Sequence, residues 1–106
     1  MPVHAISEQQ HVRLIFDGAL TIYEAAATRM QLLQLLATGQ PLEIDLNGIG
    51  EIDLSGVQLL LALLAEPLVH FLPGASVAVD SALALLDVQH WFWPQPAANG
   101  SVAAWS

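Results

Sequence analysis

The sequence predicts an α/β domain with a small mixed β-sheet of about four strands. Short runs of alternating apolar and polar residues are separated by longer segments with helical periodicity. Their order is strand, strand, helix, strand, helix, strand, helix. A helix between two strands makes neighbouring strands parallel, whereas an opening hairpin is antiparallel, so the sheet is expected to be mixed. A length of 106 residues suits one such domain.

The first two strands are predicted from polarity and turn residues. Residues 11–16 largely alternate in polarity, and Asp17-Gly18 is a turn signal that is expected to close this strand. Residues 3–6 are expected to pair with it as a short edge strand.

The first helix has a defined beginning and end. Thr21 and Glu24 have the spacing of a capping box, and Gly39 followed by Pro41 is a stop signal. The residues expected to form its apolar face are Ile22, Ala26, Met30, Leu33 and Ala37.

The middle of the chain reads as a strand, a turn and a second helix. Residues 42–46 alternate strictly, and residues 47–50 (NGIG) are expected to form a turn. Asp53 is expected to cap a helix that runs to about residue 65, before Pro67. The predicted core stripe of this helix is Val57, Leu60, Leu61 and Leu64.

The last strand and helix are predicted from weaker signals. Pro73-Gly74 indicates a turn, residues 75–79 indicate a strand, and Asp80 or Ser81 is expected to cap a helix that ends near Val88.

The chain is expected to close with an aromatic run and a tail. The aromatic residues at 90–93 are expected to fold back over the core. Residues 94–106 are small, polar and proline-bearing, and are expected to form a flexible tail. The predicted domain is therefore 1–93.

Composition excludes several functions. Two basic residues against ten acidic ones give a net charge of −8, so nucleic-acid binding is not expected. Hydrophobic residues make up 55% of the chain and charged residues only 11%, which is the reverse of a disordered sequence. With no cysteine, disulfides and cysteine chemistry are excluded. The apolar content exceeds what so small a domain is expected to bury, which indicates a partner-covered surface.

Membrane insertion is not expected either. The longest apolar stretch, residues 56–72, contains Gln58, Glu66, Pro67 and His70. Residues 1–10 lack the features of a signal peptide. The expected location is the cytoplasm.

Three carboxylates are candidates for chemistry. Asp45, Glu51 and Asp53 surround the predicted strand-to-helix turn, where α/β folds often place function. They suggest a divalent-cation or phosphate-transfer site. However, the chain has no lysine and no glycine-rich phosphate loop, and Asp53 is explained by capping. We favour no metal here and expect no cofactor.

Other polar residues also lack a catalytic pattern. Ser55 does not lie in a G-x-S-x-G elbow, because Asp53 occupies the first glycine position. The four histidines show no metal-ligand spacing: His4, His11, His70 and His90. No catalytic residue is therefore expected.

Residues 42–63, LEIDLNGIGEIDLSGVQLLLAL, closely resemble the signature of STAS domains, the anti-sigma-factor antagonist family. Residues 16–26, FDGALTIYEAA, resemble that family's entry into its first helix. Residues 79–88 resemble its last passage from strand to helix. The resemblance covers roughly residues 10–90 and implies a small mixed sheet with helices mainly on one face.

The resemblance implies a non-enzymatic bacterial signalling module that acts by protein binding. In anti-sigma factor antagonists (anti-anti-sigma factors), which regulate transcription, a Ser or Thr directly after the turn's Asp is phosphorylated by a kinase-type anti-sigma factor. The matching position here is Leu54, which has no hydroxyl group. Ser55, one residue along, is the remaining candidate for phosphorylation.

The implied partner is an anti-sigma factor kinase or a chemotaxis or two-component protein. The alternative is that the chain is the STAS subunit of a bacterial phospholipid ABC transporter. A small enzyme or nucleotide-binding protein built on the carboxylates is a third, remote interpretation. The scarcity of charge also leaves self-association into a homodimer open.

The predicted partner-binding surface follows from helical spacing. Residues 54, 58 and 62 lie one turn apart, away from the core stripe. The predicted partner-binding residues are Gly50, Glu51, Asp53, Leu54, Ser55, Gln58 and Ala62.

Overall fold

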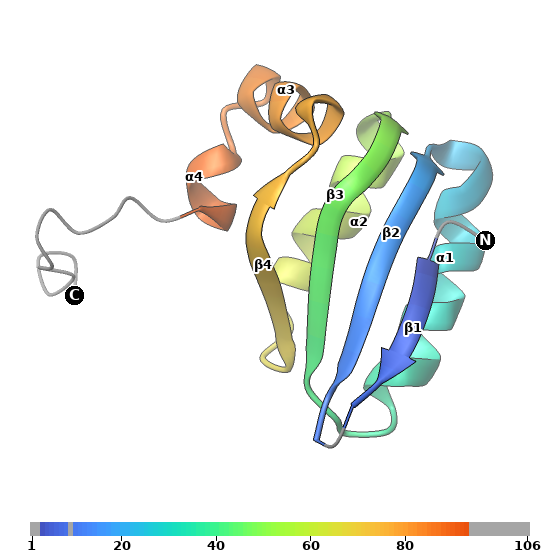
Figure 1. The fold of residues 1–106 in the computed structure, drawn as a ribbon. Coiled ribbons are helices and arrows are strands. Elements are labelled where there is room, and N and C mark those ends of the chain that lie inside the picture. The colour runs from blue at the N-terminus through green and yellow to red at the C-terminus, as the bar shows by residue number, and fades with distance from the viewer. Residues whose placement is uncertain (1–2, 9, 94–106) are drawn as a thin grey trace, which may run out of the picture.

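The computed structural model describes residues 3–8 and 10–93, and the predicted tail at 94–106 lies outside the described residues. The chain alternates strands and helices in the expected order, with one additional short helix at the end (Figure 1). The elements are β1 (Val3–Ser7), β2 (Val12–Leu20), α1 (Ile22–Leu36), β3 (Leu42–Ile52), α2 (Leu54–Leu64), β4 (Val69–Ala75), α3 (Val77–Leu85) and α4 (Gln89–Phe92).

The four strands form one mixed sheet in the order β1-β2-β3-β4, as predicted. β1 is antiparallel to β2, whereas β2, β3 and β4 are mutually parallel. Helices α1 and α2 lie side by side on one face of the sheet, behind it in Figure 1, and α3 and α4 gather beside β4. Across residues 3–8 and 10–93, no helix covers the opposite face of β1 and β2.

The core lies between the sheet and α1–α2. Alternate residues of β2 and β3, such as Leu14 and Ile44, are fully buried, while their neighbours point to the open face. From α2, Val57 and Leu60 are buried as predicted, and Leu61 and Leu64 are partly buried against the same cluster. Leu59 and Leu63 join them, so the buried stripe is wider than expected.

The predicted turns at Asp17-Gly18 and 47–50 are wrong: both segments continue their strands. β2 and β3 remain paired through these residues, with register shifts after Ile15 and after Gly18. A Cβ on Gly48 would lie 2.6 Å from the backbone oxygen of Phe16, so the glycine there allows two strands to approach closely. The Asn-Gly sequence indicated a turn because single-sequence patterns carry no information on pairing with a distant strand.

The predicted strand at 75–79 is also wrong. The strand is β4, and Pro73-Gly74 lies inside it rather than before it. Helix α3 already begins after Ser76, whose hydroxyl oxygen accepts a hydrogen bond from the Val79 N–H at 3.2 Å. Neither Asp80 nor Ser81 caps the helix, and residues 79–88 are therefore not a passage from strand to helix.

The predicted apolar face of α1 is exposed rather than buried. Ile22 is 63% exposed and Met30 is 59% exposed, and Ala26, Leu33 and Ala37 are exposed as well. The helix instead buries Thr28 and Leu32. Apolar residues occur around most of α1, so their spacing alone does not identify the face that packs on the sheet.

The aromatic run does fold back onto the core. Phe92 is 5% exposed, and its ring packs edge-on against Phe71 of β4 with centroids 5.2 Å apart. Val88 is buried beside it. Across residues 3–8 and 10–93, every helix is too short or too polar to cross a membrane.

Candidate functional site

The N-termini of α1 and α2 meet at a single carboxylate, that of Asp53. Its Oδ1 accepts a hydrogen bond from the Gly56 N–H at 3.2 Å and so caps α2, as predicted. Its Oδ2 accepts a second hydrogen bond, from the Ile22 N–H of α1 at 2.9 Å. Asp53 therefore satisfies free amide groups of two helices and holds their first turns together.

The capping box at the start of α1 is confirmed. The Glu24 carboxylate accepts hydrogen bonds from the Thr21 N–H at 3.1 Å and from the Thr21 hydroxyl at 2.6 Å. The first turn of α1 is thus fixed on one side by its own residues and on the other side by Asp53.

Both carboxylates are held in their charged forms. The hydrogen bond from the Ile22 N–H, joined by that from Gly56, lowers the pKa of Asp53 below its usual range. The hydrogen bonds from Thr21 lower the pKa of Glu24 in the same way. A carboxylate whose pKa is lower in the folded state stabilises the fold above its unfolded pKa, and this contribution is lost as pH falls through the folded pKa.

Asp53→Asn is therefore expected to weaken the acid dependence of stability. The wild-type melting temperature should fall as pH drops below the ordinary Asp pKa of 3.8. The variant keeps an oxygen acceptor but cannot ionise there, so its melting temperature should fall less over the same pH range. Thermal unfolding between pH 6 and the acid limit measures this. Glu51→Gln is the control, because it removes the same formal charge at an exposed position of β3. If the melting temperature depended on pH equally in both variants, Asp53 would not be the carboxylate responsible.

Gly56 sets the position of α2 on the sheet. A Cβ at this residue would lie 2.2 Å from the backbone oxygen of Leu20 and 2.7 Å from Cγ1 of Ile52. The first turn of α2 thus packs directly on the end of β2. This close approach brings α2 alongside α1, whose N-terminus follows β2.

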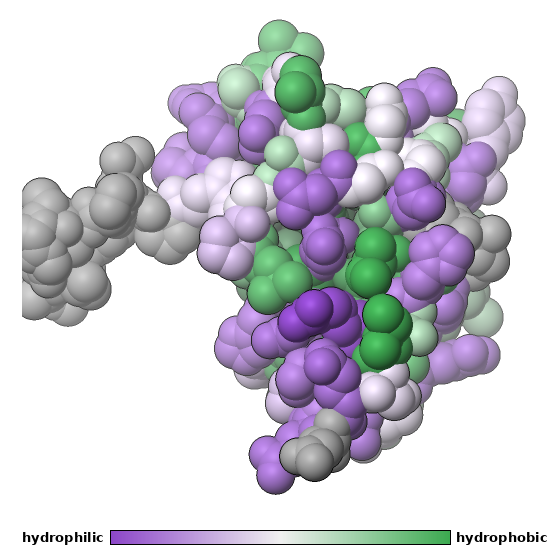
Figure 2. Space-filling view, viewed as in Figure 1, coloured by the Kyte–Doolittle hydropathy of each residue, from purple (hydrophilic) through white to green (hydrophobic). Residues whose placement is uncertain are grey.

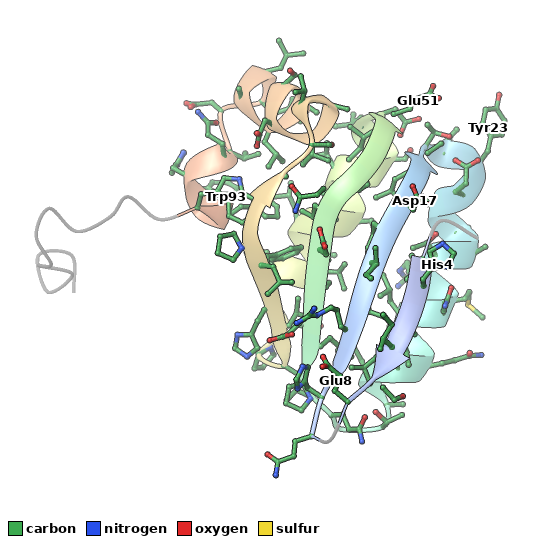
Figure 3. All side chains as sticks on the ribbon, in the orientation of Figure 1. His4, Glu8, Asp17, Tyr23, Glu51 and Trp93 are labelled. Carbon is green, nitrogen blue, oxygen red and sulfur yellow. The ribbon has the colours of Figure 1, made fainter. Side chains whose placement is uncertain are left out.

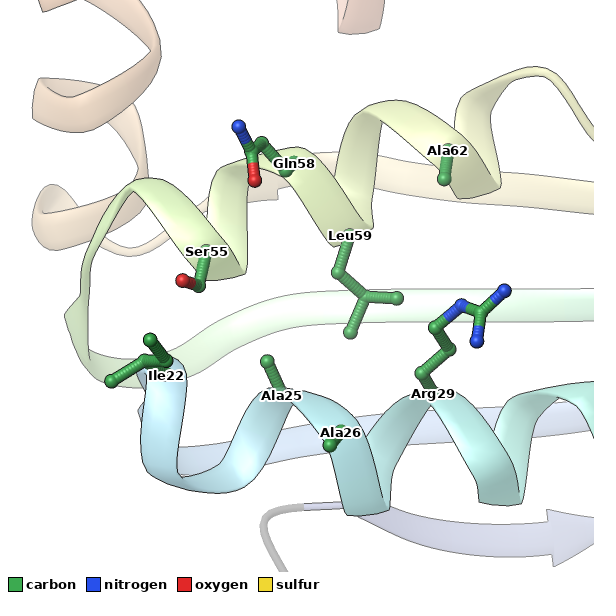
Figure 4. Close-up of a pocket in the computed structure, with 8 residues that line it drawn as sticks. All are labelled: Ile22, Ala25, Ala26, Arg29, Ser55, Gln58, Leu59 and Ala62. Atoms are coloured by element: carbon green, nitrogen blue, oxygen red, sulfur yellow. The ribbon is translucent and has the colours of Figure 1, made fainter.

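A groove of about 360 Å³ runs between the exposed sides of α1 and α2 (Figure 4). It is lined by Ile22, Ala25, Ala26, Arg29, Ser55, Gln58, Leu59 and Ala62. A second hollow of about 120 Å³ continues along the same pair of helices to Glu66, with Arg29, Leu59 and Ala62 shared between the two. In Figure 4, Leu59 and Arg29 project toward each other from the facing helices.

Three of the predicted partner-binding residues line this groove: Ser55, Gln58 and Ala62. Leu54 lies at the start of α2 and is 57% exposed, beyond the groove lining. Gly50 and Glu51 are exposed near the end of β3, three and two residues before Asp53. The predicted residues thus form one surface around the N-terminus of α2.

The wall contributed by α1 was not predicted from the sequence. Ile22, Ala25, Ala26 and Arg29 line the groove opposite α2. The apolar series beginning at Ile22 and Ala26 is the sequence signal for this wall, and these two residues border the groove instead of the core.

The three carboxylates considered for metal binding do not come together. Because β3 extends to Ile52, Asp45 and Asp53 are separated by roughly 25 Å of strand. Within residues 3–8 and 10–93, Asp45, Glu51 and Asp53 do not gather within reach of one ion. Asp45 accepts hydrogen bonds from the Asn47 N–H and side-chain amide, each at 2.9 Å.

The fold and this surface define a class: a small α/β domain that presents a tightly fixed helix N-terminus beside an apolar groove. A family model described as "Mlab, STAS domain" matches residues 4–90, about four fifths of the chain. The chain therefore belongs to the STAS domain family, as the sequence resemblance indicated. No curated protein matches the chain significantly.

Proposed function

We propose that this STAS domain is a non-enzymatic module that binds a protein partner through the surface around α2. We call this the docking surface: Gly50, Glu51, Asp53, Leu54, Ser55, Gln58 and Ala62, with the α1 wall of the groove. The observation that carries the proposal is the exposed apolar groove between α1 and α2, continuous with exposed Leu54. Apolar surface of this kind is normally covered in a complex.

We further propose that binding does not depend on phosphorylation of this chain. Leu54 occupies the family's usual phosphorylation position and carries no hydroxyl group. As an anchor in a partner's pocket it would contribute about 1.5–3 kcal/mol if fully buried. Ser55 lines the groove beside the charged Asp53, which would repel a phosphoryl group carrying close to two negative charges.

The proposed partner is a signalling protein, either a kinase-type anti-sigma factor or a chemotaxis or two-component protein. The second candidate is that the chain is a subunit of a bacterial phospholipid ABC transporter. The apolar docking surface and the leucine at position 54 favour this second candidate in one respect, because permanent complexes bury more apolar surfaces than reversible ones.

Intact-mass measurement after incubation with purified partner and ATP tests the proposed mode of binding. The kinase-type anti-sigma factor and the transporter ATPase from the same genome are the two partners to compare. We expect a complex with one of them whose affinity is the same with and without ATP, and a chain whose mass does not change. A stoichiometric phosphate adduct on Ser55, accompanied by loss of binding, would restore the phosphorylation switch and overturn the proposal.

A further inference from the structure

The open face of the sheet carries a second cluster of polar side chains, far from the docking surface. Glu8 follows β1, His11 precedes β2, and Glu43 lies near the start of β3. Figure 2 shows hydrophilic side chains gathered over this lower part of the sheet, and Figure 3 labels Glu8 there. The β1–β2 connection and β3 thus bring two carboxylates and one imidazole to the same place.

Backbone contacts hold the three residues close together. The Glu8 N–H donates a hydrogen bond to the His11 carbonyl at 2.8 Å, which closes the connection between β1 and β2. Parallel pairing places Val12 beside Leu42, so His11, directly before β2, lies near Glu43 of β3. Their side chains are about one third exposed, and that of Glu8 is 40% exposed, so the cluster is accessible from solvent.

The distances from the imidazole nitrogen to both carboxylates suit a shared metal ion, and the three ligand atoms lie within 4.8 Å of one another. His11 Nε2 lies 2.9 Å from Glu8 Oε1 and 3.1 Å from Glu43 Oε1. With metal–ligand bonds of about 2.0–2.2 Å, neighbouring ligand atoms lie roughly 3–3.5 Å apart, so small side-chain adjustments would suffice. Imidazole with two carboxylates is a donor set suited to zinc and similar divalent transition metals.

The imidazole nitrogen also lacks a well-aligned hydrogen bond. His11 Nε2 is shielded from solvent, and within the described residues no acceptor lies in line with it. Both carboxylate oxygens are close but lie to the side of the ring N–H direction, which suits a shared ion between the three atoms better than a linear ion pair.

We propose that Glu8, His11 and Glu43 form a binding site for one divalent transition-metal ion. Two carboxylates and a neutral imidazole balance the charge of the ion. The ion would join the β1–β2 connection to β3. Arg13, whose Nη2 lies 3.4 Å from Glu43 Oε1 and whose Nε lies 3.8 Å from Glu8 Oε1, is the cation that metal binding would displace.

Zinc titration of the untagged protein, freed of metal with EDTA, tests the site. Isothermal titration with ZnCl2 should show one saturable site per chain, and the melting temperature should rise with zinc concentration. Zinc should also shift the NMR signal of the His11 ring nitrogen. His11→Gln and Glu43→Gln should each weaken zinc binding at least about tenfold.

His4→Gln is the matched control, because His4 is exposed on β1 and lies outside the trio (Figure 3). It should bind zinc like the wild type. Each variant is compared with its own metal-free form, so that a loss of stability is not mistaken for a loss of metal binding. Absence of saturable binding, or equal binding in His11→Gln, would overturn the proposal and leave the cluster as an ion-pair network of Arg13 with the two carboxylates.

Discussion

Gly56→Ala is expected to lower the melting temperature by more than about 10 °C. The new Cβ would lie 2.2 Å from the backbone oxygen of Leu20, which cannot move without distorting β2. Helix α2 would have to shift away from the sheet, at a cost of about 3 kcal/mol or more. A loss of stability would point to this steric conflict, because replacing glycine by alanine within a helix usually stabilises the helix by about 1 kcal/mol. Thermal and urea unfolding measure the change.

Gly50→Ala is the matched control for this prediction. A Cβ at Gly50 meets no atom within 4 Å, and the residue does not adopt a positive φ. Its melting temperature should stay within a few degrees of the wild type. Wild-type stability of Gly56→Ala would mean that α2 does not rest on the end of β2.

Ala62→Glu is expected to weaken partner binding by at least about a hundredfold, or roughly 2.7 kcal/mol. Ala62 is exposed and lines both hollows between α1 and α2, so a carboxylate there would be desolvated by any partner that fills the groove. Arg29 lines the same hollows and lies within the groove to accept the new charge in the free protein. The melting temperature should therefore change little. Gln58→Arg should have the same effect on binding.

Ala27→Glu provides the matched control for the interface. Ala27 is exposed on α1 and does not belong to the groove lining, so the same change in charge should leave binding unaffected. Isothermal titration with the partner and thermal unfolding of each variant separate the two effects. Unfolding of Ala62→Glu or Gln58→Arg would show that this side of α2 is core, and unchanged binding would remove it from the docking surface.

The parts of the fold that depend on neighbouring residues were predictable. The capping box of Thr21 and Glu24 and the cap at Asp53 fix where α1 and α2 begin, and both follow from side chains within one turn. The strict alternation at 42–46 identified the buried face of β3. The sequence order of strands and helices then implied the mixed sheet.

The parts that depend on distant contacts were not predictable. Gly48 permits close contact with β2, whereas its sequence indicates a turn. The second hydrogen bond of Asp53 reaches the Ile22 N–H, 31 residues away, and no local pattern reveals it. The α1 wall of the groove was not predictable for the same reason. In a largely apolar helix, the spacing of apolar residues does not distinguish a buried face from an exposed face that binds a partner.

The shared carboxylate of Asp53 also constrains how the groove can deform. Its two walls are tied together at one end, where Asp53 bonds to the Ile22 and Gly56 amides, while the other end extends toward Glu66. Widening of the groove is therefore a hinge motion about the Asp53 end. Amides at the first turns of α1 and α2 should exchange with solvent as one cooperative unit. A partner bound at the far end should therefore also slow amide exchange at the end that bears Leu54.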